Sequence, residues 1–376
     1  MSPPLKVALV CPTVGQTQRG YERFMTDIHR LLGSDLDVTL LKGGGTQGPR
    51  ERVFRHVKRT GLLSRLFPNR FQYQRFRIEF ATFAAALLPH LVRAGYDVVH
   101  FIDPPLGKPL HRIRKLAGRR FSLLFTNGGP VSYDCSRWAD HIHCVTPTAV
   151  LEACQKGLDR SRLTMLPVGV DTSRFRTSGS RDEIRRKLNI APDAFMILAV
   201  TSLNRAHKRV DHLIDEVAQV SGDLVLWVEG SLHPDGDASL LTLGSERLGG
   251  RWRHSQIRSE QIGDLFGCAD ILVSSAIQES FGLAIVEAAC AGLPVVVHDS
   301  PHFRWLLGGN GYYVDMSSRG ALAEFLGWAM SNRGELRRAV DPQALLARFG
   351  WTRLKTEYAN MYTHIAALAA QGGGPT

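Results

Sequence analysis

Two glutamates eight positions apart stand on either side of a glycine in the most informative stretch of the sequence. Glu279 and Glu287 flank the run Ser280-Phe-Gly-Leu283, which follows an apolar segment and opens an apolar helical pattern. The first turn of a helix exposes unpaired N–H groups, and Gly282 lets a ligand approach them closely. A phosphate group is therefore the ligand expected there. Helical side chains lean toward the N-terminus, so Glu287 can reach back beside the same place. The spacing predicts a bound phosphate with a carboxylate placed to accept hydrogen bonds from a ribose diol.

A second group of charged residues follows another apolar segment, in the run Thr201-Ser-Leu-Asn-Arg-Ala-His-Lys-Arg209. Arg205 and Lys208 stand just before a helical pattern. Cations at a helix N-terminus are unfavourable with the helix dipole unless an anion is bound there. The pattern therefore indicates a second anion contact, with a solvated helix start as the alternative.

The elements that must position these residues alternate between short β-rich runs and longer helical patterns, which is typical of parallel βα units. The expected strands are Lys6–Cys11, Val38–Leu41, Asp97–Phe101, Ser122–Phe125, His141–Val145 and Leu163–Pro167, then Met196–Val200, Leu224–Val228, Ile271–Ser274, Val295–His298 and Tyr312–Val314. The polar stretch Thr172–Asp182 reads as a linker. We expect an α/β fold of two Rossmann-like domains, 1–175 and 183–350, with a helix at about 352–370 returning to the first. Ligands of such sheets gather at the carboxyl ends of the strands.

Composition excludes several classes of protein. The 376 residues are 44% hydrophobic and 22% charged, as in soluble globular chains rather than disordered or fibrous ones. No apolar stretch has the length of a membrane span. The six cysteines form no Cys-x-x-Cys pair, which argues against a zinc site and indicates a reducing, cytoplasmic compartment.

The net charge of +11 predicts an anionic partner, and much of the excess lies in one segment. Between Arg50 and Arg77, basic residues interleave with apolar ones in the manner of a helix on an anionic surface. Peripheral membrane contact and an ordinary basic helix packed on the domain remain equal alternatives. No zinc-finger, homeodomain or RNA-recognition signature accompanies the charge, so nucleic acid is not expected.

The motifs together resemble a known family. Glu279 and Glu287, in their Ser-Phe-Gly-Leu and Glu-Ala-Ala-Cys-Ala-Gly-Leu-Pro-Val surroundings, are similar to the Glu-x7-Glu motif of retaining, nucleotide-sugar-dependent glycosyltransferases of the GT-B type. The runs Leu166–Phe175, Cys144–Ala149, Ala269–Ser275 and Tyr312–Asp315 match other family elements in the right order. The resemblance covers nearly the whole chain.

The resemblance implies roles for individual residues. Glu287 would bind the donor ribose and Glu279 would face the donor sugar, while the backbone of Ser280, Phe281, Gly282 and Leu283 would hold the diphosphate or sugar hydroxyls. Arg205 and Lys208 would neutralise the diphosphate leaving group, with Arg209 as a rival because the spacing departs from the family pattern. Gly15 and Gly20 would line the turn beside the donor phosphates, with a plain turn role as the alternative. Cations in this position make an obligatory metal or other cofactor unnecessary.

The acceptor side departs from the family more clearly. Asn127 stands where the family often has a histidine and cannot act as a base, so acceptor activation is left open. Arg19 replaces a glycine of the family's Gly-Gly turn. His100 and Asp103, at a strand end, would line the acceptor site, although a structural histidine is equally expected.

We therefore expect a nucleoside diphosphate sugar as donor and a glycan, lipid-linked or small-molecule acceptor. A GT-B epimerase, a phosphorylase and a non-catalytic glycan- or nucleotide-binding module are the alternatives.

Overall fold

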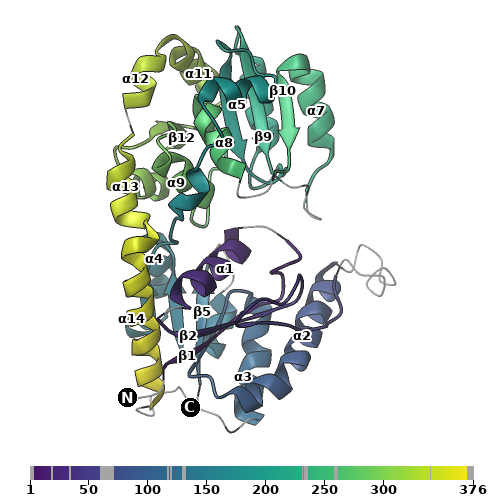
Figure 1. The fold of residues 1–376 in the computed structure, drawn as a ribbon, viewed down its shortest axis with the longest axis vertical. Coiled ribbons are helices and arrows are strands. Elements are labelled where there is room, and N and C mark those ends of the chain that lie inside the picture. Colours follow the sequence, from purple (N-terminus) through teal and green to yellow (C-terminus); the bar gives the residue numbers. More distant parts are fainter. Residues whose placement is uncertain are drawn as a thin grey trace. The chain divides into compact units, whose positions relative to one another are not determined.

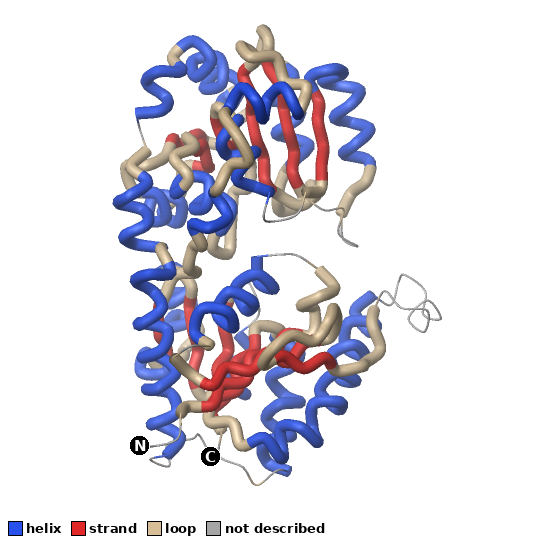
Figure 2. Tube along the Cα trace, viewed as in Figure 1, coloured by secondary structure: helices blue, strands red, loops and turns tan. Residues whose placement is uncertain are grey.

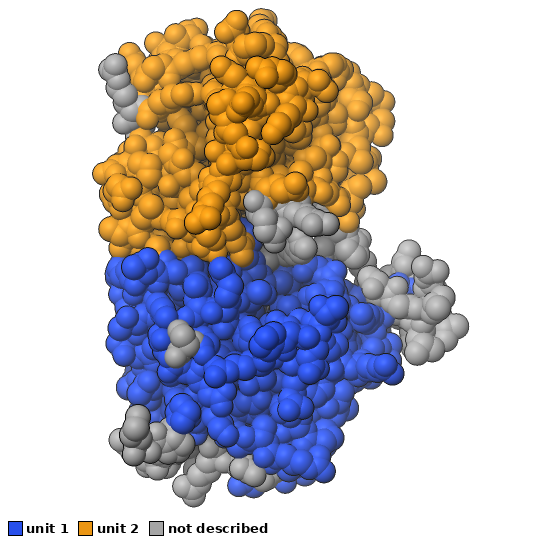
Figure 3. Space-filling model, viewed as in Figure 1, with its two compact units in different colours: residues 1–169, 351–376 blue, residues 170–350 orange. Residues whose placement is uncertain are grey.

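The structure is a computed structural model, which divides into two compact units. One unit comprises residues 1–169 and 351–376, and the other comprises 170–350 (Figure 3). The described residues are 4–17, 20–33, 35–59, 72–116, 118, 121–128, 133–230, 232, 236–257, 261–338 and 340–370.

The first unit is built on a sheet of seven parallel strands in the order β3-β2-β1-β4-β5-β6-β7. Helices surround this sheet (Figures 1 and 2). The strands are β1 (Lys6–Cys11), β2 (Asp37–Lys42), β3 (Glu51–Val53), β4 (Val98–Phe101), β5 (Ser122–Asn127), β6 (His141–Cys144) and β7 (Leu163–Met165). The central strands are almost entirely buried, as expected of a parallel sheet covered by helices on both faces.

The helices of this unit are α1 (Gly20–Leu32), α2 (Gln72–Ala94), α3 (Gly107–Leu116), α4 (Pro147–Gln155) and α14 (Trp351–Ala370). Helix α14 comes from the far end of the sequence and packs against α1, β4 and β5. Helix α2 packs on α3, and its phenylalanines Phe80 and Phe83 are buried in the core cluster.

Buried hydrogen bonds fasten α14 to the sheet. Nδ1 of His100 lies 2.7 Å from the hydroxyl of Tyr362, and its Nε2 lies 2.5 Å from Oγ1 of Thr126. Thr126 Oγ1 is also 2.9 Å from Nδ1 of His143, and the hydroxyl of Tyr358 is 3.3 Å from Nε2 of His143. Because buried polar groups are costly unless paired, this chain of contacts favours one position of α14 on β4, β5 and β6.

The second unit has six parallel strands in the order β10-β9-β8-β11-β12-β13. They are β8 (Phe195–Val200), β9 (Leu224–Glu229), β10 (Trp252–Ser255), β11 (Ile271–Val273), β12 (Val295–His298) and β13 (Tyr312–Val314). Its helices are α5 (Arg181–Lys187), α6 (Val210–Ala218), α7 (Ser239–Leu248), α8 (Ile262–Cys268), α9 (Leu283–Cys290), α10 (Pro301–Leu307), α11 (Ala321–Ser331), α12 (Arg333–Arg338) and α13 (Pro342–Phe349).

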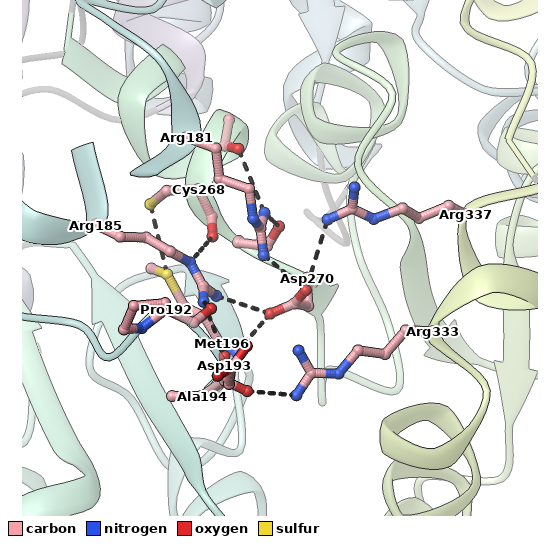
Figure 4. Close-up of polar contacts among 12 residues, drawn as sticks. Arg181, Arg185, Pro192, Asp193, Ala194, Met196, Cys268, Asp270, Arg333 and Arg337 are labelled. Carbon is pink, nitrogen blue, oxygen red and sulfur yellow. Dashed lines mark hydrogen bonds and ion pairs between the residues drawn. The ribbon is translucent and has the colours of Figure 1, made fainter. Parts of the chain in front are cut away.

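A buried acid organises one end of this sheet (Figure 4). Asp270, which precedes β11, accepts hydrogen bonds from Arg181 at 2.7 Å and from Arg185 at 2.9 Å. It also accepts a bond from the backbone N–H of Met196, at 2.9 Å. Arg185 is only 1% exposed and donates to several backbone carbonyls as well, so its guanidinium is satisfied without water. Helix α5 is thereby anchored to β8 and β11.

The predicted fold class is confirmed, since both units are doubly wound parallel sheets. Strands β3 and β10 were not predicted, because both are short edge strands whose sequences carry few apolar residues. The helix expected from Arg50 is wrong for the described residues 51–59: Glu51–Val53 forms β3, and Phe54 then packs against the core. Residues 60–71 of that basic stretch lie outside the described residues. None of the described helices is long and apolar enough to cross a membrane.

Candidate active site

The loops that carry the predicted charged residues of the second unit meet at its sheet. Strand β8 lies between β9 and β11, so the loops that follow β8 and β11 start side by side where the strand order reverses. Lys208 from the first loop and Glu279 from the second form an ion pair, with 2.5 Å between Nζ and Oε1. Their side chains are 28% and 14% exposed, so the pair lies in a partly screened position open to solvent. The structure thus joins two residues that are 71 positions apart.

A serine at the end of β11 holds the β8 loop in place. The hydroxyl of Ser275 is 2.7 Å from the carbonyl oxygen of Lys208 and 3.0 Å from that of Arg209. Arg209 has a φ of +50° and precedes helix α6, and its guanidinium donates to the carbonyl of Met316. The left-handed backbone at a non-glycine residue is strained and needs such surrounding contacts to persist. Arg209 is therefore engaged in fixing the loop that presents Lys208.

Helix α9 begins at the predicted glycine. Gly282 is the residue before the helix, has a φ of +94°, and accepts the first helical bonds from Ile285 and Val286 at 3.0 and 3.1 Å. No side chain caps this helix start, and Ser280 and Leu283 beside it are half-buried. The N–H groups at the start of α9 therefore have no capping side chain, as an anion site requires.

Phe281 is fixed from the opposite side by an aromatic cluster. Its ring lies edge-on to those of Trp305 and Phe349, with centroids 6.4 and 5.9 Å away. Its carbonyl accepts a hydrogen bond from Nε2 of His302 at 3.1 Å. Burial lowers the pKa of His302, against the opposing effects of the Phe281 carbonyl and the Glu279 charge. His302 is therefore close to both parts of the loop and was not predicted from the sequence.

Glu287 lies one turn inside α9 and is 2% exposed. Its neighbours Ile285, Val286 and Ala288 are buried apolar residues. Burial and the charge of Glu287 raise the pKa of the Cys290 thiol to about 12. A carboxylate buried among apolar side chains needs a partner that compensates for its lost hydration. The role of Glu287 toward a donor ribose stays a prediction.

Arg205 points toward other partners. It bonds Asp237 at 2.5 Å and Ser239 at 2.9 Å, and lies 3.6 Å from Asp211. With its side chain 42% exposed, it is held toward α7 by acids rather than toward the Lys208–Glu279 pair. Its role toward a diphosphate stays a prediction.

The first unit places its predicted residues at the carboxyl ends of β1, β4 and β5. Gly15 follows β1 with a φ of +80°, and a Cβ there would stand 2.3 Å from the carbonyl oxygen of Gly44. Gly20 opens α1, where a Cβ would meet nothing. Asn127 ends β5 and is 2% exposed. Arg19 lies outside the described residues.

Asp103 is half-buried, whereas His100 is fully buried. Burial raises the pKa of Cys11 at the end of β1, and the charges of Asp103 and Glu22 raise it further, so these acids lie near that strand end. His100, in contrast, is fully buried and contacts Tyr362 and Thr126. A structural role for His100 is therefore consistent with its position, because its buried imidazole presents no surface that an acceptor could contact.

Among the functional candidates, sequence reasoning missed Ser275 and His302. Ser275 could have been suspected as a polar residue at the end of a buried strand. His302 gave no such indication, because it acts on a loop more than twenty residues earlier. Within the described residues, no group of three or more His, Cys, Asp or Glu side chains is arranged to hold a metal ion.

Comparison with known proteins bears on this arrangement. Residues 180–345 match the family described as "Glycosyl transferases group 1". The matched residues make up most of the second unit. The match includes both glutamates, the β8 loop and helix α9.

Curated relatives are similar to part of the chain. The D-inositol 3-phosphate glycosyltransferase of Streptomyces avermitilis is 28% identical over 236 residues, 56% of this chain and 48% of that protein. The chain thus spans about half the length of the curated relatives that it matches.

Two solved structures share the fold of this chain over nearly its whole length. Sucrose-phosphate synthase from Thermosynechococcus elongatus has a TM-score of 0.81 at 18% identity, covering 96% of this chain and 99% of that one. Anabaena HepE in complex with UDP-glucose has a TM-score of 0.77 at 18% identity, covering 96% and 100%. The two-domain arrangement of such enzymes is the GT-B fold.

Proposed function

We propose that the protein transfers a sugar from a nucleoside diphosphate sugar to an acceptor hydroxyl, with retention of the anomeric configuration. The observation that carries the proposal is the Lys208–Glu279 pair beside the uncapped start of α9. A cation, a carboxylate and exposed N–H groups in one place match the diphosphate and sugar of such a donor. The family of the second unit supports the same activity.

In this proposal the chain's residues act mainly by charge and position. Lys208 and the N–H groups at the start of α9 stabilise the negative charge that develops on the departing diphosphate. Glu287 accepts hydrogen bonds from the ribose hydroxyls, and Glu279 faces the sugar. Cations and N–H groups carry the charge stabilisation, so no metal is required.

The reaction is balanced without a protein base. The bond between the sugar C1 and the diphosphate oxygen breaks, and a bond forms between C1 and the acceptor oxygen. The acceptor proton passes to the departing phosphate oxygen on the same face of the sugar. An amide cannot take the proton, so the step does not need a base at Asn127.

UDP-glucose is the first donor to test, since a structural neighbour was solved in complex with it. We expect UDP-glucose and UDP to raise the melting temperature, because a ligand at a hundred times its Kd adds about 2.7 kcal/mol of stability. Slow UDP release without an acceptor would indicate bond cleavage at this site. Stabilisation by nucleotide sugars with no release under any acceptor would favour the non-catalytic binding module instead.

The acceptor and its location are also proposals. We infer that the loops after β1, β4 and β5 of the first unit bind the acceptor, which is a glycan, a lipid-linked sugar or a small polyol. The name of the Streptomyces relative makes inositol 3-phosphate a reasonable first acceptor to screen. Proton NMR of the product's anomeric signal would establish retention or inversion. Cytoplasmic location and peripheral membrane contact through Arg50–Arg77 remain proposals of the same kind.

A further inference from the structure

A hollow of about 640 Å³ opens on the first unit at the edge of the sheet opposite to Gly15 and Asn127. It is bounded by Lys6 and Asp37, at the amino ends of β1 and β2, by β3 and by the last turns of α2. Sequence reasoning singled out one of its lining residues, Arg52, as part of the basic stretch Arg50–Arg77, and the proposed transfer reaction makes no use of this edge.

The hollow carries more positive than negative charge. Lys6, Arg52 and Arg93 line it, and Asp37 is its one acid. Within the described part of the chain, the side chains of Lys6 and Arg52 make no hydrogen bond or ion pair. Among the residues that the structure describes, Arg93 donates only to the carbonyl oxygen of Pro89 in its own helix, at 3.3 Å. Three cations beside one acid leave an excess of positive charge, and an anion placed among them reduces their mutual repulsion.

Two paired rings, those of His90 and Tyr96, are part of the lining of the hollow. The hydroxyl of Tyr96 lies 2.9 Å from Nε2 of His90, and Tyr96 is 8% exposed. Burial lowers the pKa of His90, and the charge of Arg52 lowers it further. Burial raises the pKa of Tyr96, and a hydrogen bond with Thr39 and the charge of Arg52 oppose that rise. Arg52, His90 and Tyr96 all line the hollow, so a ligand bound there would lie beside all three.

Arginine matters here because its planar guanidinium binds phosphate oxygens through paired N–H groups. Phe54 and Ala86 add apolar surface to the same hollow. We propose that this hollow is a second binding site, separate from the donor site, for a small ligand that bears a phosphate group. The proposal does not depend on the transfer reaction.

The test is phosphate binding by the full chain, measured by titration calorimetry with inorganic phosphate. Arg52→Gln and Arg93→Gln should each weaken binding about tenfold, since a hydrogen bond to a charged group of this kind is worth that much. Arg112→Gln is the matched control: Arg112 is an exposed arginine of the same unit that does not line the hollow. All three positions are on the surface, and unchanged thermal unfolding would show that the variants fold.

Phosphate bound elsewhere, including at the start of α9, would be unaffected by Arg52→Gln. Only the phosphate binding that is lost in Arg52→Gln is therefore evidence for the proposed site. The proposal would be overturned if Arg52→Gln bound phosphate as tightly as the wild type, or if Arg112→Gln lost phosphate affinity to the same extent. Vesicles then distinguish a free phosphate ester from a lipid headgroup. Retention on phosphatidylglycerol vesicles that Arg52→Gln abolishes assigns a lipid, whereas phosphate binding with vesicle binding absent or unaffected by Arg52→Gln assigns a free ligand.

Discussion

At the residue scale, Lys208 and Glu279 each have two possible partners. Without ligand they neutralise one another at 2.5 Å, but a diphosphate would compete with Glu279 for the ammonium group. Because both side chains retain some exposure, the pair can open without a buried charge being left alone. Donor binding would then release Glu279 to meet the sugar.

Lys208→Gln should lower kcat/KM for the donor about a hundredfold or more, since removing one preorganised donor to a developing anion costs that much. Arg205→Gln should have a smaller effect, because Asp237 and Ser239 already hold that guanidinium. Steady-state kinetics with UDP-glucose compares the two variants directly. Equal losses would show that Arg205 also reaches the diphosphate.

Glu287→Gln should raise the donor KM about tenfold, because hydrogen bonds from sugar hydroxyls to a charged group are stronger than those to an amide. The residue is 2% exposed, so the melting temperature must be measured beside the kinetics. A wild-type KM in a stably folded variant would remove Glu287 from the donor site.

At the scale of elements, close backbone contact decides where the β1 loop lies. The turns after β1 and β2 touch at Gly15 and Gly44, with no room for a side chain between them. Gly20, only five residues later, has open space around it. The two glycines were given the same role from the sequence, but the structure gives them different constraints.

Gly15→Ala should reduce the free energy of unfolding by about 1–3 kcal/mol, because a Cβ would meet backbone at a positive φ. Gly20→Ala serves as the matched control, and should be neutral or stabilise by up to about 1 kcal/mol at the start of α1. Urea unfolding of both variants measures the difference. If Gly15→Ala were as stable as Gly20→Ala, the tight turn would not constrain the fold.

At the scale of the whole molecule, the first unit needs both ends of the chain. Its core includes polar contacts from β4, β5 and β6 to α14, and the segments joined by His100 and Tyr362 are 262 positions apart. Because these contacts join distant segments, the stability of the unit depends on a few buried histidines that must stay neutral. Burial lowers the pKa of His143 from 6.5 to about 4.

The sign of the resulting pH dependence follows from this shift. The unfolded chain binds the proton of His143 more readily than the folded unit, so stability should be complete above about pH 6.5 and decline as the pH falls toward 4. The loss for this group is on the order of 3 kcal/mol.

Urea unfolding across that range tests the expectation. His143→Gln should flatten the slope of stability against pH, whatever it does to stability at neutral pH. His207→Gln, at an exposed position of the second unit, should leave the slope unchanged. A pH-independent first unit would contradict the role assigned to His143.

The sequence by itself determined the alternation of strands and helices, the doubly wound class and the position of the α9 start. These depend on local patterns: apolar runs of strand length, and a glycine with flanking acids before a helix. Strands β1, β12 and β13 have the predicted bounds. Edge strands β3 and β10 carry no such pattern, since only one side of each is paired within the sheet.

Only the tertiary structure decided which charged residues meet. Lys208 joins Glu279, whereas Arg205, three residues earlier, turns to Asp237, and no local pattern separates the two. His100 was expected equally as a site residue or a structural one, and its burial follows from α14 lying on the sheet. Contacts between distant segments depend on strand order and helix packing, which local spacing does not encode.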